Sequence, residues 1–141
     1  MLFARDIMTT DVITVTLHTK LDETVQLLLE HGISGVPVVD DEKNIVGIIS
    51  EFALLSLAYE PSASDECVVN YMSRRVITVE ENTLISDVAD LFIQNRVRRV
   101  PVTINDELCG IISRRDLLRA SQSRERKIAH PEPFVSQVPT R

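Results

Sequence analysis

The feature that most constrains this sequence is an internal repeat, which relates residues 8–55 to residues 72–118. A shift of 64 positions places Met8 on Met72, and the two copies then keep the same order of apolar runs and turns. Repeats of this kind are structural units that bury their apolar faces against one another. We therefore expect one globule with pseudo-twofold symmetry. The clearest matching stretches are 12–15 with 76–79, 36–38 with 100–102 and, after one residue is dropped from the next loop, 47–50 with 110–113.

Each copy is predicted to contain a strand, a helix, two further strands and a second helix. Short β-branched runs favour strands, and apolar residues at helical spacing favour helices. The first copy predicts strands at 12–15, 35–39 and 45–49 and helices at 21–32 and 51–58. The second copy predicts strands at 76–79, 99–103 and 108–112 and helices at 84–95 and 114–120.

The first long helix has a predicted start and a predicted end. Thr19 stands three residues before Asp22, which is the spacing of a capping box. Gly32 follows the last apolar residues of the helical pattern. Glycine tolerates the left-handed conformation that helix ends favour, so we expect the helix to end there.

These elements predict an α+β fold made of two βαββα repeats packed in one globule. We assign residues 1–60 to the first repeat, 61–70 to a linker, 71–120 to the second repeat and 121–141 to a flexible C-terminal tail. The linker begins with Pro61 and is rich in serine and acidic residues, as loops are. Aromatic residues make up 4% of the chain and tryptophan is absent, so the core must be aliphatic.

Composition argues against several classes of function. The net charge is -6, with 21 acidic against 15 basic residues, so the chain lacks the basic surface of a general nucleic-acid binder. We expect no secretory signal, no membrane span and a cytoplasmic protein, because no basic segment and apolar run open the chain and no apolar stretch approaches about 18 residues. Cys67 and Cys109 are expected to be free thiols, and the scattered positions of His18, His31 and His130 predict no metal site.

The repeated pattern resembles a known family. Val36-Pro37-Val38 and Gly47-Ile48-Ile49-Ser50 in one copy, with Val100-Pro101-Val102 and Gly110-Ile111-Ile112-Ser113 in the other, are similar to the signatures of the CBS domain. The tandem arrangement, covering about residues 4–120, resembles a CBS pair, also called a Bateman module. This resemblance implies intramolecular pairing of two βαββα repeats and a homodimer of pairs. It also implies adenosine ligands such as AMP, ADP, ATP or S-adenosylmethionine in clefts between the repeats.

The resemblance places the main ligand site at residues 110–116. Asp116 would accept hydrogen bonds from the ribose hydroxyls, Ser113 would add a hydroxyl, and Arg114 and Arg115 would suit phosphate. An alternative remains open, because Ser113 and Asp116 also have the spacing of a capping box. The first copy is expected to complete this cleft with Ile33, Ser34, Gly35, Val36 and Pro37, together with Val12, Ile13 and His18.

Several of these residues have a second interpretation. Ile33 and Val36 could cover the adenine, Ser34 could donate to a phosphate and Gly35 could let the backbone approach the ligand. Val12, Ile13 and Val36 could equally be ordinary core residues.

A second and weaker site is predicted around the first copy's equivalent motif. Ala53 stands where Asp116 stands in the second copy, so a ribose there would lose its acceptor. Arg98 and Arg99 could hold phosphate in that cleft or reach across into one large shared site. They could also be a solvated basic edge that prevents strand pairing. The residues assigned to this site are Arg98, Arg99, Pro101 and Ser50.

The leading hypothesis from the sequence is a regulatory module that senses an adenosine-containing nucleotide. A bound nucleotide would change the arrangement of the repeats or of a dimer, and through it a protein target that the sequence does not identify. The alternative is a ligand-free homodimeric scaffold for a partner protein, which the missing acceptor at Ala53 favours. The sequence contains no catalytic constellation, so we expect no enzyme activity and no catalytic cofactor.

Overall fold

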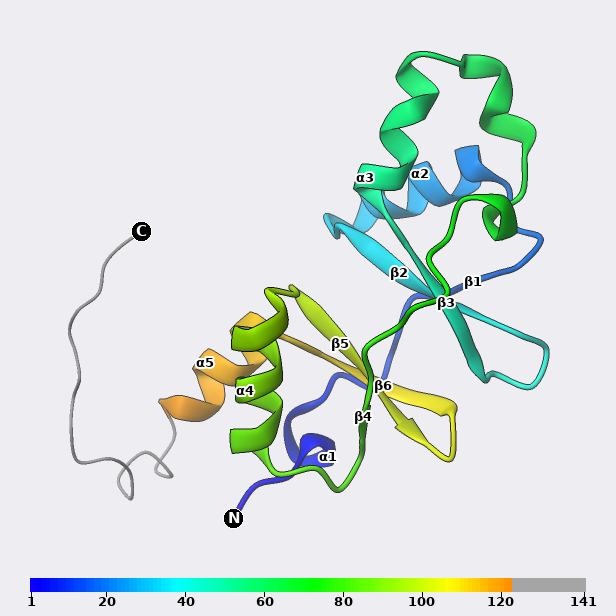
Figure 1. The fold of residues 1–141 in the computed structure, drawn as a ribbon. Helices are drawn as coiled ribbons and strands as arrows, with labels where there is room; N and C mark the ends of the chain where they lie inside the picture. Colours follow the sequence, from blue (N-terminus) through cyan, green and yellow to red (C-terminus); the bar gives the residue numbers. More distant parts are fainter. Residues whose placement is uncertain (123–141) are drawn as a thin grey trace.

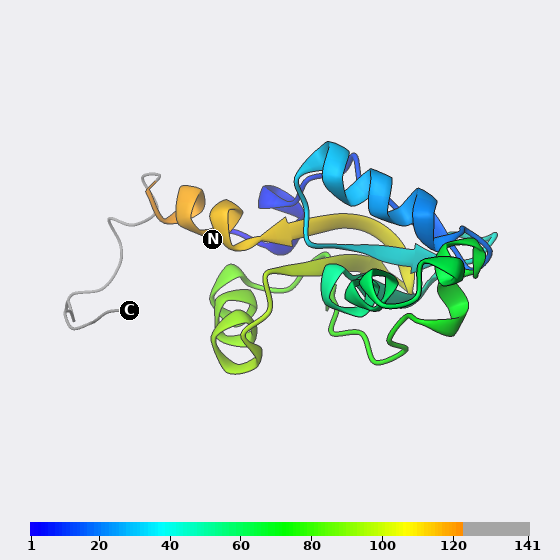
Figure 2. The same ribbon diagram turned by 90° about the horizontal axis from the view of Figure 1, so that it is seen from above.

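The computed structural model describes residues 1–122 and shows a mixed α+β fold with two repeats (Figure 1). The strands run through the middle of the molecule, with α2 on one side and α4 on the other (Figure 2). No helix within residues 1–122 combines the length and the apolar character needed to cross a membrane. The first repeat contains β1 (Val15–Thr16), α2 (Leu21–His31), β2 (Gly35–Val39), β3 (Ile45–Ser50) and α3 (Glu51–Leu54). The second contains β4 (Val79–Glu80), α4 (Ile85–Asn95), β5 (Arg99–Ile104), β6 (Glu107–Ser113) and α5 (Arg114–Ser121).

The two repeats have the same sheet topology. In the first sheet β2 is central, parallel to β1 and antiparallel to β3, and in the second sheet β5 has the same place between β4 and β6. Both antiparallel pairs change register at equivalent points, after Val38 and after Val102. Each sheet packs against one core of mostly aliphatic residues, which includes Ile49 in the first repeat and Ile112 in the second. The predicted pseudo-symmetric α+β fold is therefore confirmed. The second core also contains the buried Phe92, so the expectation of a purely aliphatic core is wrong there.

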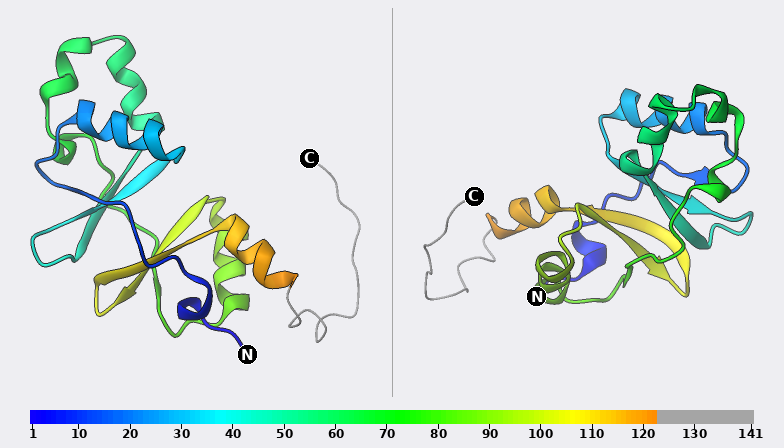
Figure 3. Two further views of the ribbon diagram at one scale, coloured as in Figure 1. Left: turned by 180° about the vertical axis from the view of Figure 1, so that it is seen from behind. Right: turned by 45° about the horizontal axis from the view of Figure 1, so that its top comes forward.

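Each core also contains a residue from outside its own repeat. The segment before the first repeat packs in the second core, and the segment before the second repeat packs in the first core. Ala4, in α1 (Ala4–Ile7), is fully buried in the core of the second repeat, and its N–H donates to the carbonyl of Thr83 at 2.8 Å. Val68, exactly one repeat length later, is fully buried in the core of the first repeat, where its N–H donates to the carbonyl of Thr19 at 2.8 Å. Figures 1 and 3 show α1 beside the second sheet.

The connecting segment is more ordered than a loop composition indicates. Residues 61–70, predicted as a linker, contain the 3₁₀ turns Pro61–Asp65 and Val68–Asn70. Another 3₁₀ turn, Leu55–Ala58, comes just before them. The helix predicted at 51–58 is therefore α-helical over Glu51–Leu54 and continues as this 3₁₀ turn. The tail predicted at 121–141 lies outside the described residues from residue 123 onward, and Ser121 is the last residue of α5.

The opening strands are shorter than predicted and begin later. Strands expected at 12–15 and 76–79 are Val15–Thr16 and Val79–Glu80. The preceding residues leave the sheet of their own repeat because the chain there contacts the other repeat: Thr9 pairs with Ile111 of β6. The β-branched runs indicate extended backbone but do not reveal which strand, if any, it pairs with.

The predicted N-cap of α2, Thr19, is wrong by one residue, whereas the predicted first residue, Leu21, and the predicted end at Gly32 are confirmed. The N-cap is Lys20, whose N–H donates to the Glu23 carboxylate at 3.1 Å, and the Thr19 hydroxyl instead accepts from the N–H of Thr16 at 3.0 Å. Gly32 ends the helix in the left-handed conformation with φ 61°. In α4 the equivalent position is Arg96, which adopts φ 54° without the help of glycine.

Two glycines let the connecting segments cross the sheets. A Cβ added to Gly47 would lie 2.6 Å from the Met72 sulfur and 2.9 Å from the carbonyl oxygen of Ser73. At the equivalent Gly110, a Cβ would collide with the side chain of Met8 instead. The Ser73 carbonyl is less free to move, because it accepts the N–H of Ile48 at 2.9 Å and so joins the segment to β3.

Gly47→Ala should therefore lower the free energy of unfolding by about 1–3 kcal/mol, the usual cost of forcing extra volume into packed structure. Urea denaturation followed by circular dichroism measures the loss. Adding Met72→Ala should not restore stability, because the clash with the Ser73 carbonyl remains, whereas Met8→Ala should relieve most of the cost of Gly110→Ala. Full rescue of Gly47→Ala by Met72→Ala would contradict this account.

Candidate functional site

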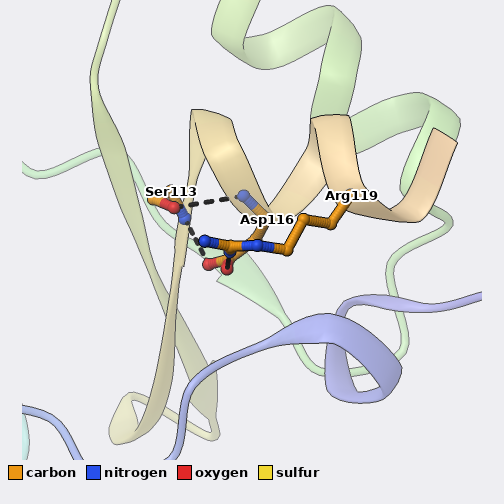
Figure 4. A network of polar contacts seen from close by, with 3 residues as sticks. All are labelled: Ser113, Asp116 and Arg119. Atoms are coloured by element: carbon orange, nitrogen blue, oxygen red, sulfur yellow. Dashed lines mark hydrogen bonds and ion pairs between the residues drawn. The ribbon is translucent and has the colours of Figure 1, made fainter. Parts of the chain in front are cut away.

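The start of α5 holds a compact polar network around one carboxylate (Figure 4). The N–H of Ser113 donates to Asp116 Oδ2 at 2.9 Å, and the N–H of Asp116 donates to Ser113 Oγ at 3.2 Å. This reciprocal pair is a capping box, so the alternative interpretation of Ser113 and Asp116 as helix caps is confirmed. The other carboxylate oxygen, Oδ1, accepts from Arg119 Nη1 at 3.0 Å.

Capping does not use up the carboxylate of Asp116. Each carboxylate oxygen can accept more than one hydrogen bond, and here each has one donor. Arg119 is 70% exposed, so its ion pair with Asp116 lies at the surface and can be broken at small cost. Asp116 can therefore cap the helix and still accept hydrogen bonds from a ligand.

A cleft of about 210 Å³ opens beside this network, between the two repeats. Its walls come from the segment before β1, the start of β2, the start of β5 and the junction of β6 with α5. Thr9 and Ile111 hold the walls together, since each N–H donates to the other's carbonyl at 2.9 Å. The lining residues are Thr9, Asp11, Val12, Ile13, Ile33, Gly35, Pro37, Arg99, Ile111, Ser113 and Asp116.

The cleft brings together seven of the residues that the sequence assigned to the main site, from both repeats: Val12, Ile13, Ile33, Gly35, Pro37, Ser113 and Asp116. The other five do not line it. Val36 is 1% exposed and belongs to the core of the first repeat, as the alternative interpretation held. Ser34 uses its carbonyl to accept the N–H of Glu51 at 2.8 Å. His18, Arg114 and Arg115 are exposed outside the cleft.

The residues assigned to the second site are dispersed. Ser50 caps α3, accepting the N–H of Ala53 at 3.4 Å, and Pro101 is fully buried in β5. Arg98 is exposed, and its carbonyl accepts the N–H of Arg114 at 3.2 Å. Arg99 lines the cleft of Asp116, so its assignment to the Ala53 cleft differs from its place in the structure. This arrangement corresponds to the alternative in which Arg99 reaches across into the other site.

Sequence reasoning missed three residues of the cleft, Thr9, Asp11 and Ile111. Ile111 alternates with the buried Gly110 and Ile112, and that alternation could have indicated that it faces the other side of β6. Thr9 and Asp11 directly precede the apolar run at Val12. Their sequence gives no separate signal, because their position depends on the pairing of one repeat with the other.

Other candidate sites carry less chemistry. Cys67 and Cys109 are free thiols, as predicted. Burial, with the charges of Glu81, Glu80 and Glu107, raises the pKa of the Cys109 thiol, which favours the protonated thiol over the reactive thiolate. Within residues 1–122, no group of three or more histidine, cysteine, aspartate or glutamate side chains could hold a metal ion.

Comparison with known proteins identifies relatives along nearly the whole described chain. The family model for the CBS domain matches residues 4–60 and again residues 68–123. An uncharacterised protein of Methanocaldococcus jannaschii is 30% identical over 115 residues, covering 82% of this chain and 41% of that protein. The chain thus spans less than half the length of this relative.

Solved structures share the fold. CBSX2 in complex with AMP superposes with a TM-score of 0.79 at 30% identity, covering 88% of this chain and 98% of that one; CBSX2 is a protein of Arabidopsis thaliana. A CBS domain pair in complex with 5′-methylthioadenosine and S-adenosyl-L-methionine gives a TM-score of 0.73 at 25% identity, covering 84% of this chain and 94% of that one.

Proposed function

Because the chain belongs to the CBS domain family and carries two CBS repeats, we propose that it is a regulatory, non-catalytic module that binds an adenosine-containing nucleotide between its repeats. The observation that carries this proposal is the carboxylate of Asp116, 15% exposed beside a cleft that both repeats line. Two relatives of the same fold, one in complex with AMP and one with 5′-methylthioadenosine and S-adenosyl-L-methionine, support an adenosine ligand here.

The cleft offers a partner for each part of such a ligand. Asp116 would accept hydrogen bonds from the two ribose hydroxyls, which are neutral donors to a charged acceptor. Val12, Ile13 and Ile33 would pack on the adenine ring. Arg99 is the cationic side chain on the lining and would meet a phosphate or carboxylate.

Gly35 would let the ligand approach the backbone at the start of β2. It carries no side chain, and its Cα lies close to β3, where an added Cβ would stand 3.1 Å from the carbonyl oxygen of Ile49. The equivalent residue of the second repeat is Arg99, so the two repeats contribute different chemistry from matched positions to the same cleft.

The readout of binding would be a change in how the repeats pack. A ligand in this cleft contacts both repeats, so it can stabilise one relative arrangement over another. It shifts that equilibrium only if it binds the two arrangements with unequal affinity. Calorimetric titration with AMP, ADP, ATP and S-adenosylmethionine tests binding, and hydrogen exchange at the Thr9–Ile111 contact tests the readout. Absence of binding by all four compounds would refute the proposed function.

We also propose that the module forms a homodimer through the helices of both repeats. Leu29 of α2 is 77% exposed and its repeat equivalent, Ile93 of α4, is 75% exposed. Leu55 and Leu118 form a second equivalent pair, at 58% and 63% exposure. Exposed apolar residues in matched positions on both repeats favour a two-fold symmetric interface, and Phe52, 80% exposed beside a groove between α2 and α3, extends this surface.

The double variant Leu29→Glu, Ile93→Glu should therefore be monomeric where the unmodified protein is a dimer. Charges placed at the centre of an apolar interface would have to be buried without partners. Sedimentation velocity measures the assembly state, and circular dichroism verifies that the variant is folded. Asn82→Glu, at an exposed position in the turn between β4 and α4, adds a charge away from the exposed apolar residues and should leave the dimer intact. A dimer in both variants would contradict this interface.

The ligand-free scaffold remains a second candidate for two reasons. Arg119 already pairs with Asp116, and the equivalent position of the first repeat, Ala53, has no acceptor for a ribose. A scaffold would form the same dimer and capture the same partner protein with or without nucleotide. Partner capture that is unchanged by AMP and by Asp116→Ala would favour the scaffold over the sensor.

A further inference from the structure

The charges that line the cleft do not suit a ligand with several phosphates. Two carboxylates, of Asp11 and Asp116, face one guanidinium, of Arg99. The lining therefore carries more negative than positive charge, although nucleotide phosphates are anions. Arg114 and Arg115 begin the adjacent helix α5, but both are exposed and neither lines the cleft.

The two carboxylates differ in what surrounds them. Asp116 accepts hydrogen bonds from the Ser113 N–H and from Arg119, so donors already offset its charge. Asp11 is exposed, and within residues 1–122 its carboxylate has no ion pair and no hydrogen bond. Within the same range no ion pair joins Arg99 to either carboxylate. Of the two carboxylates, Asp11 is therefore the one with which no cation of the described residues pairs.

The fold does not require an acid at this position. The residue one repeat length after Asp11 is Arg75, which is also exposed. The same place in the pseudo-symmetric fold thus accepts either sign of charge. Since the carboxylate of Asp11 makes no hydrogen bond or ion pair within residues 1–122, removal of its charge should change the electrostatic field of the cleft and leave the fold as it is.

We propose that Asp11 sets the ligand class of the cleft, selecting adenosine compounds with at most one phosphate, or with a cationic group in its place, against nucleoside triphosphates. This inference rests on the proposed adenosine-binding function. A phosphate chain extending from a ribose at Asp116 is repelled by Asp11, and each added phosphate increases the repulsion. A sulfonium or ammonium group, as in S-adenosylmethionine, is attracted instead. Asp11 is thus a specificity-determining residue that leaves binding of the adenosine part unchanged.

The test is calorimetric titration of adenosine, AMP, ATP and S-adenosylmethionine into the unmodified protein and into Asp11→Asn, at low and at high salt. Asp11→Asn should tighten ATP binding by about tenfold and AMP binding by about threefold at low salt, and weaken S-adenosylmethionine by a few fold, as expected for one unit charge near partly solvated groups. Adenosine, which is neutral, should bind both proteins equally. High salt should shrink these differences, because it screens exposed charges.

Asp41→Asn is the matched control. Asp41 is exposed in the turn between β2 and β3 and does not line the cleft, so this variant changes the net charge equally without touching the site. An equal gain in ATP affinity in Asp41→Asn, or an unchanged preference among the four ligands in Asp11→Asn, would overturn the inference. In either case, binding of adenosine would still support the proposed function. Failure of adenosine and all three other compounds to bind would refute the function itself, and this inference with it.

Discussion

Asp116→Ala should lower the affinity for AMP by at least about a hundredfold, the largest effect expected of any single change in the cleft. Hydrogen bonds to a charged group are worth about 1.5–3 kcal/mol each, and the variant removes the acceptor for both ribose hydroxyls. Isothermal titration calorimetry of the unmodified and variant proteins measures the loss. Adenosine should lose as much affinity as AMP, because both carry the same ribose.

The same variant also removes half of the capping box of α5, so stability must be separated from binding. Asp116 Oδ2 accepts the Ser113 N–H at 2.9 Å, and loss of this cap should cost about 1 kcal/mol. Ser113→Ala is the matched control, because it removes the reciprocal hydrogen bond, at 3.2 Å, and leaves the carboxylate in place. It should unfold at a similarly lowered urea concentration and keep most of its affinity for adenosine. Equal losses of affinity in both variants would show that Asp116 acts only as a cap.

The repeat made the architecture predictable, because it doubles every local signal. One Val-Pro-Val run or one Gly-Ile-Ile-Ser end is weak evidence, but two in register indicate a single unit used twice. The elements that were predicted well, such as β2, β3 and α4, have local causes: apolar runs on either side of a polar turn, and apolar residues at helical spacing. Elements that depend on the other repeat were predicted less well. The strand expected at 12–15 begins only at Val15, because the preceding chain crosses to β6.

The residues of the candidate site show the same contrast between local signals and contacts with the other repeat. Ser113 and Asp116 were visible in the sequence because their spacing is a local property of one helix start. Arg99 and Asp11 enter the cleft from different repeats, and no spacing within either repeat indicates that they meet there. The pairing of Thr9 with Ile111, which brings the two repeats together at this cleft, is a long-range contact that the sequence pattern does not encode directly.

Val68→Asp should be the most destabilising substitution in the segment predicted as a linker, with an expected loss of at least about 3 kcal/mol. Val68 is fully buried and packs in the same core as Leu21 and Ile49. A carboxylate there would lie in aliphatic surroundings without a partner, which is among the most costly changes that a single mutation makes. Ser62→Asp, at an exposed position of the same segment, should change stability by no more than about 0.5 kcal/mol. Urea denaturation separates the two, and equal midpoints would mean that the segment is only a tether.

Ala4→Asp extends this test to the second repeat. Ala4 is one repeat length before Val68, is equally buried, and packs in the core of the second repeat together with Val88 and Ile112. If each repeat is completed by a segment preceding the other, the two variants should destabilise opposite cores, and hydrogen exchange should show the first loss of protection in β2 for Val68→Asp and in β5 for Ala4→Asp. Because the segments that carry Ala4 and Val68 continue into Thr9 and Ser73, which bond across to Ile111 and Ile48, damage to either core should also loosen the contact between repeats. The arrangement would be contradicted if Ala4→Asp raised hydrogen exchange only in the first repeat, or if Val68→Asp raised it only in the second.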